Sequence, residues 1–240
     1  MKGSRKKVGG LPLSVEIFLS GFLYLFILVL QIAMASFGYI LEPTPKHYES
    51  DSKLLNFNNS PKKFQISVVL ALIEHFSVVT LPIVLFIVFS SYNIILGIVW
   101  MIFRIAEGLI QVYIEKDYWK LLNIAKKYSI SSDAEKSPLI DSYHTILKEK
   151  SYRFTFAMIG WSIGTLALSL VLVIYVVAAP PFIGWLGIAA SIGIGLVNVA
   201  KLVKPNLKVY DTMSSIFGML AIVFELIIGG WLIFYSLIIP

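Results

Sequence analysis

Cysteine is absent from this chain of 240 residues, and charged residues are scarce at 14% of the total. The lack of cysteine excludes disulfides, thiolate metal sites and cysteine nucleophiles. Soluble domains carry roughly a quarter charged residues, well above the fraction found here. Hydrophobic residues make up 58% of the chain and its mean hydropathy is +0.82. A soluble core of this size would leave much apolar surface in water, so we expect lipid to be the solvent.

Enzyme signatures are also missing from the sequence. It contains no GxSxG, HExxH, Walker or GxGxxG motif. Of its three histidines, His47 and His144 fall in polar loops, so we predict no metal site and no cofactor. The formal net charge is +6, but the basic residues lie between apolar blocks and no nucleic-acid motif accompanies them. We therefore expect the lipid bilayer, and not nucleic acid, to be the partner of these charges.

Six apolar segments are each long enough to cross a membrane, since a helix needs about 20 apolar residues to span the hydrocarbon core. They predict an all-α protein, a polytopic transmembrane helix bundle that forms a single integral membrane domain over residues 1–240. The segments cover residues 13–39, 64–89, 94–114, 154–178, 182–203 and 213–238.

The connections between these segments differ in length and charge. The turns at 90–93 and 179–181 are short and uncharged, so segments two and three should form one antiparallel hairpin, and segments four and five another. Loop 115–153 is long and charged, yet apolar residues recur in it at helical spacing, which predicts an extramembrane helical loop. The termini and both short turns therefore share one side of the membrane, and loops 42–63, 115–153 and 204–211 share the other.

Small residues recur at intervals of four in two of the segments. Gly160 and Gly164 form such a pair, and Gly187, Ser191 and Gly195 continue the pattern in the next segment. Faces of this kind let helix backbones approach closely in a membrane. We interpret both stripes as packing surfaces within one chain, with a dimer interface as the alternative.

Ionisable and amide side chains inside spans are costly, so they usually face the bundle interior and mark function. The candidates for a ligand or ion site are Glu74, His75, Arg104, Glu107, Gln111 and Glu225. Arg104, Glu107 and Gln111 are spaced so that they share one face of a helix. Counting inward from the span ends at about 1.5 Å per residue places Glu74 and Glu225 at depths compatible with Arg104. We therefore predict that the carboxylates converge on the arginine inside the bundle.

The charges of this predicted site do not balance. One arginine faces three carboxylates, which gives a net charge of −2 when all are ionised. Such an excess is unfavourable at low dielectric constant unless a carboxylate is protonated, His75 is protonated or a cation is bound. We interpret the chain as a membrane protein whose buried Glu/Arg site binds a proton, a cation or a small polar ligand, for transport or sensing.

Two other functions fit the same residues. In the first, a structural or accessory subunit, Arg104 only bridges Glu74 and Glu225 as a clamp between helices, with Glu107 turned toward water. Alternatively, a glutamate would act as the acid or base of an intramembrane enzyme. The missing enzyme signatures favour a role without catalysis, and catalytic residues cannot be assigned.

Short motifs in the spans resemble those of the prokaryotic membrane proteins of domain-of-unknown-function family 4386. The motifs are Glu74 before Leu81-Pro82, Phe103-Arg104-x-x-Glu107, the segment from Pro181 to Gly187 with Trp185, and Phe224-Glu225. The resemblance covers most of the chain. It implies six spans and an N-terminus inside the cell, and it implies no activity, because the function of that family is not established.

The predicted orientation conflicts with the distribution of basic residues. Lys and Arg are normally enriched in cytoplasmic loops, and here they are more numerous in the three loops than beside the N-terminus. That distribution would place the N-terminus outside. The short turns lack the Lys or Arg that the family usually has there. We follow the family resemblance and predict a multi-pass protein of the cell membrane with its N-terminus inside.

Overall fold

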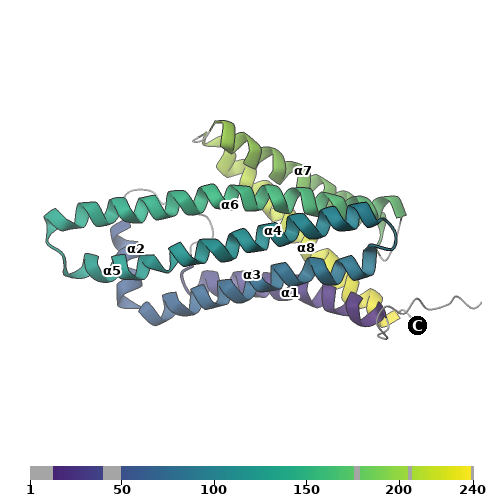
Figure 1. Cartoon of the computed structure of the whole chain (residues 1–240), viewed down its shortest axis with the longest axis horizontal. Coiled ribbons are helices and arrows are strands. Elements are labelled where there is room, and N and C mark those ends of the chain that lie inside the picture. Colours follow the sequence, from purple (N-terminus) through teal and green to yellow (C-terminus); the bar gives the residue numbers. More distant parts are fainter. Residues whose placement is uncertain (1–12, 40–49, 176–178, 205–206, 239–240) are drawn as a thin grey trace, which may run out of the picture.

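The computed structural model describes residues 13–39, 50–175, 179–204 and 207–238, and these ranges contain helices and turns but no strand. Eight helices are present in this part of the chain (Figure 1). They are α1 (Leu13–Ser36), α2 (Ser50–Asn59), α3 (Pro61–Phe89), α4 (Ile94–Tyr118), α5 (Lys120–Ile130), α6 (Asp133–Tyr175), α7 (Pro181–Val203) and α8 (Val209–Ile238). The all-α fold class predicted from the sequence is confirmed.

Six of the helices are long and apolar enough to cross a membrane: α1, α3, α4, α6, α7 and α8. The predicted number of spans is therefore confirmed, although some ends differ. α1 ends at Ser36 and not at Tyr39, and α3 begins at Pro61, where a proline at the first helical position needs no N–H partner. The predicted end of the fourth span, 176–178, lies outside the described residues.

The six spans close into a ring. Each packs against two others, in the order α1, α3, α4, α6, α7 and α8, and α8 returns to α1. The predicted hairpins, α3 with α4 and α6 with α7, are neighbours in this ring. Asn93 begins the second arm of the first hairpin, because its side chain accepts a hydrogen bond from the backbone N–H of Leu96 at 3.1 Å. A closed ring of this kind has an interior that is shielded from lipid.

The predicted helical loop 115–153 consists of the end of α4, all of α5 and the first half of α6. At about 1.5 Å per residue the 43 residues of α6 extend over about 65 Å, well beyond the roughly 30 Å hydrocarbon core. α6 starts with a capping box, since Glu135 accepts hydrogen bonds from the backbone N–H and hydroxyl of Ser132. α2 and α5 pack together at the same end of the molecule, opposite the two short turns (Figure 1).

Both stripes of small residues pack within the chain. A Cβ atom added to Gly160 would lie 3.1 Å from the carbonyl oxygen of Phe103 on α4. On α7, Gly187 faces Phe224 of α8, and the Ser191 carbonyl accepts a hydrogen bond from Ser162 of α6 at 2.6 Å. Close approach of α6 to α4 and of α7 to its two neighbours thus needs these small side chains.

Candidate functional site

The interior of the ring holds a cavity of about 260 Å³, which we call the polar cavity. All six spans contribute to its wall. All six site residues predicted from the sequence line it: Glu74, His75, Arg104, Glu107, Gln111 and Glu225. Each is at most 8% exposed. The structure therefore brings together side chains that the sequence places on α3, α4 and α8.

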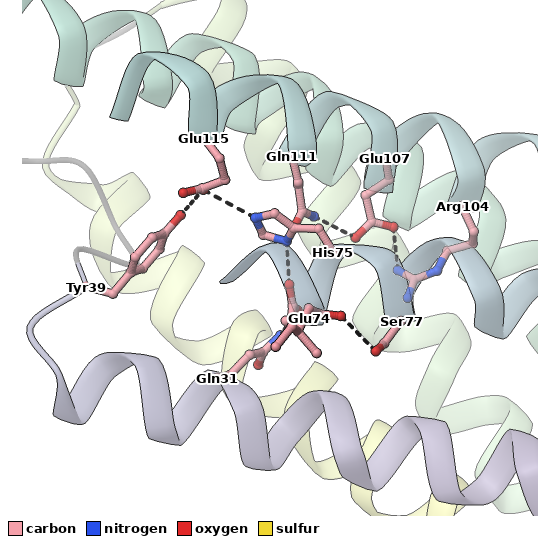
Figure 2. A network of polar contacts seen from close by, with 10 residues as sticks. Gln31, Tyr39, Glu74, His75, Ser77, Arg104, Glu107, Gln111 and Glu115 are labelled. Carbon is pink, nitrogen blue, oxygen red and sulfur yellow. Dashed lines mark hydrogen bonds and ion pairs between the residues drawn. The ribbon is translucent and has the colours of Figure 1, made fainter. Parts of the chain in front are cut away.

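One row of polar side chains follows α4 (Figure 2). Arg104 Nη1 donates to Glu107 Oε2 at 2.6 Å, and Gln111 Nε2 donates to Glu107 Oε1 at 3.0 Å. The predicted common face of these three residues is present. The guanidinium carbon of Arg104 lies 5.4 Å from the ring centroid of Trp100 and 5.9 Å from that of Trp161. One carboxylate and two indole faces thus hold the arginine charge in place.

Close packing of α6 fixes the position of Arg104. A Cβ atom on Gly164 would lie 2.8 Å from Cγ of Arg104 and 3.4 Å from the carbonyl oxygen of Trp100. The absence of a side chain at Gly164 therefore leaves the space through which the arginine stem reaches the cavity. The pair Gly160 and Gly164 on α6 therefore allows close packing against α4 and also leaves room for the Arg104 side chain.

A second row of polar side chains connects α1, α3 and α4 (Figure 2). Gln31 Nε2 donates to Glu74 Oε1 at 3.0 Å, and Glu74 Oε2 contacts His75 Nδ1. His75 Nε2 lies 3.3 Å from Glu115 Oε1, which also accepts from the hydroxyl of Tyr39. Because a neutral imidazole donates from one nitrogen only, carboxylates at both nitrogens fit the imidazolium form of His75.

Glu225 enters the cavity from α8. It accepts a hydrogen bond from Nε1 of Trp161 on α6 at 3.0 Å. Trp161 therefore stands between the carboxylate of Glu225 and the guanidinium of Arg104, and contacts both.

The family described as "Domain of unknown function (DUF4386)" matches residues 19–235, which is most of the chain. The chain belongs to the DUF4386 family. The family suggested by the span motifs is thus confirmed. No curated protein and no solved structure matches the chain.

One arrangement considered for this DUF4386 chain is wrong. In the clamp hypothesis Arg104 bridged Glu74 and Glu225 while Glu107 faced water. The ion pair of Arg104 instead joins Glu107 on its own helix, and Glu107 is only 2% exposed. Within the described residues Arg104 forms no ion pair with Glu74 or Glu225. A contact three residues away is favoured because it requires no particular spacing between helices.

Several residues of the DUF4386 site were not predicted. They are Gln31, Tyr39, Glu115, Lys150 and Trp161. Gln31 carried a usable signal, since it is a polar side chain in an apolar span. Glu115 and Lys150 lie in the charged stretch that was assigned to a loop, so their burial gave no signal. Lys150 Nζ is 4.0 Å from the ring centroid of Tyr39 and 3.9 Å from that of Tyr118.

Two buried polar atoms of the site have no hydrogen-bond partner among the described residues. They are Nε of Arg104, a donor, and Oε2 of Glu115, an acceptor. Buried polar groups are nearly always paired with protein, water or a ligand. The two atoms belong to the two polar rows of the cavity wall of this DUF4386 protein.

Proposed function

We propose that this DUF4386 membrane protein binds a proton or a small cation in the polar cavity, as a step in transport or sensing. The observation that carries the proposal is the charge of the cavity wall. Four carboxylates line it, those of Glu74, Glu107, Glu115 and Glu225, against two full cations, Arg104 and Lys150. A protonated His75 reduces the excess of negative charge without removing it.

The cost of that excess supports the proposal. All four carboxylates are at most 8% exposed, and like charges repel strongly where water is sparse. A proton shared among the carboxylates, or a cation between them, lowers this cost. The unpaired Oε2 of Glu115 supplies an acceptor for such a ligand. Ionisable groups inside a membrane bundle commonly serve ion or proton pathways.

The second polar row suggests a direction of access. Glu115, Lys150 and Tyr39 lie toward α5 and the long loops, whereas Arg104 and Glu225 lie deeper within their spans. Gln111 and His75 lie between Glu115 and Arg104 (Figure 2). We propose that a proton or cation enters from the loop side and reaches the deeper carboxylates along these side chains.

Infrared titration of the reconstituted protein tests proton binding, because a protonated carboxyl has its own carbonyl band. Glu225→Gln and Glu107→Gln should each remove one titrating buried carboxyl from the wild-type curve. Asp141→Asn, a change at an exposed carboxylate at the outer end of α6, is the matched control and should leave the buried signal unchanged. A parallel titration with Na⁺ and K⁺ at fixed pH tests cation binding. The proposal fails if both titrations are the same in wild type and in the cavity variants.

A structural role is the second candidate, and the hydrogen bonds between helices favour it. Gln31 to Glu74 joins α1 to α3, His75 to Glu115 joins α3 to α4, and Trp161 to Glu225 joins α6 to α8. Bonds of this kind in membranes contribute about 0.6 kcal/mol on average. A purely structural site predicts that Glu225→Gln lowers stability and leaves proton and cation titrations unaltered.

We propose the orientation that the family resemblance implies, with the N-terminus and the short turns inside the cell. The absence of cysteine makes it easy to test. Single substitutions Ser91→Cys, in the turn between α3 and α4, and Lys127→Cys, on α5, both fall at exposed positions. In intact cells a membrane-impermeant maleimide should label Lys127→Cys and should reach Ser91→Cys only after permeabilisation. The opposite labelling pattern would support the orientation that the basic residues indicate.

A further inference from the structure

A second pocket lies apart from the polar cavity, on the loop side, where α6 passes the connection between α7 and α8. We call it the basic pocket, and its volume is about 830 Å³. Its wall includes Lys148, Tyr152, Lys201, Leu202, Leu207 and Lys208. Nothing in the proposed function of the cavity uses these residues, so an inference about them stands independently.

The electrostatics of the basic pocket favour an anion. Lys148, Lys201 and Lys208 form no ion pair with any residue that the structure describes. Lys201 Nζ donates to Ser214 Oγ at 2.8 Å, and this bond orients the ammonium group without neutralising it. Asp211 also lines the wall and opposes an anion, but it is outnumbered by the three lysines.

The other charged residues of the wall already balance each other. Arg153 is paired with Asp117 and, at 3.2 Å, with Glu149. The remaining positive charge of the basic pocket therefore comes from the lysines. Ammonium groups bind phosphate as point charges.

The position of the pocket is that of a lipid headgroup. α7 ends at Val203 and α8 begins at Val209, so Lys201 and Lys208 lie where the chain leaves the hydrocarbon core, and Lys148 of α6 lines the same wall. Between the charges the wall exposes apolar surface, with Tyr152 60% and Leu207 47% exposed. Aromatic rings and lysine stems are favoured at this depth of the bilayer.

A narrower groove of about 170 Å³ continues from the basic pocket toward the membrane interior. Lys201 and Thr155 line both, and the groove then runs past Met158 on α6, Ile194 on α7 and Gly218 on α8, three residues that also line the polar cavity. Phe154, Met158, Ile194 and Val197 give this groove an apolar lining, interrupted by the buried Asn198. A molecule with an anionic head and an apolar chain would fill both the basic pocket and the groove, whereas a free phosphate would fill only the basic pocket.

We propose that the basic pocket binds one anionic phospholipid, with its phosphate among Lys148, Lys201 and Lys208 and an acyl chain in the groove that α6, α7 and α8 line.

Lipid titration of the purified full chain, followed by native mass spectrometry, tests the proposal. The wild type should bind phosphatidylglycerol more tightly than phosphatidylcholine. Lys201→Gln combined with Lys208→Gln should weaken phosphatidylglycerol binding by roughly 10- to 30-fold, the factor expected for two basic side chains at a membrane surface. Lys208→Gln alone, at an exposed position, should give a smaller loss with unchanged thermal unfolding.

The control is Lys126→Gln combined with Lys127→Gln, two exposed lysines of α5 that change the net charge by the same amount. This variant should bind phosphatidylglycerol like the wild type. Equal weakening in both double variants would show general charge attraction and overturn the proposal, as would a wild type without preference for phosphatidylglycerol. Displacement of bound lipid by inorganic phosphate at equal concentration would assign the pocket to free phosphate and overturn it as well.

Discussion

Arg104→Gln should be among the most destabilising single changes in this protein, with a loss of about 3–5 kcal/mol in the free energy of unfolding. The substitution removes the cation that pairs with Glu107 at 2.6 Å and leaves that carboxylate buried. It also removes the charge that lies against the rings of Trp100 and Trp161. Unfolding of the purified protein in mixed micelles measures the loss.

A double-mutant cycle separates this pair from its surroundings. Arg104→Gln combined with Glu107→Gln should recover part of the loss, because no unpaired charge then remains, with a coupling energy of about 0.5–3 kcal/mol. Cycles of Arg104 with Glu74 or Glu225 should give smaller couplings, since Arg104 forms no ion pair with either of them in the described part of the chain. Simple additivity of Arg104→Gln and Glu107→Gln would contradict the ion pair.

Gly21→Ala should also be strongly destabilising, by about 1–3 kcal/mol or more, because it overfills a helix contact. A Cβ atom there would lie 2.6 Å from the carbonyl oxygen of Gly229 and 2.8 Å from the backbone nitrogen of Ile233, both on α8. Backbone atoms cannot move aside as a flexible side chain does, so α1 and α8 must separate. Since this contact closes the ring of spans, thermal unfolding should begin at a clearly lower temperature.

Gly230→Ala is the matched control for this substitution. Gly230 is also on α8, and a Cβ atom there would meet nothing within 4 Å. Alanine is the better helix former, so this variant should be as stable as the wild type or slightly more stable. If both alanine variants unfold alike, close packing of α1 on α8 does not limit stability.

The sequence predicted the number of spans and their pairing because both depend on local properties. Runs of apolar residues identify spans. The turn after Phe89 is so short that α4 must run antiparallel to α3 and pack beside it. The closing contact of α1 with α8 was not predictable in the same way. It depends on Gly21 meeting Gly229 across almost the whole chain, and one sequence contains no sign of that pairing.

The sequence identified residues that line the polar cavity where a polar side chain is conspicuous in an apolar span. Glu74, Arg104 and Glu225 stand out in apolar spans, and their approach to one cavity followed from depth alone. Glu115 and Lys150 are equally buried, but they lie among other charged residues in the sequence, so their burial could not be predicted from composition. Only the alternative clamp arrangement named the wrong partners for Arg104, because whether a side chain pairs along its own helix or across to another depends on rotamers that spacing does not determine.

The length of α6 has a mechanical consequence. This one continuous helix begins at the capped end near Asp133 and carries two residues of the cavity wall. Lys150 lies against the rings of Tyr39 and Tyr118, and Trp161 donates a hydrogen bond to Glu225. A twist or tilt of α6 at its Asp133 end would therefore move the ammonium group of Lys150 and the indole of Trp161 in the cavity wall. A partner that docked on the protruding end of α6 would therefore move side chains in the wall of the polar cavity.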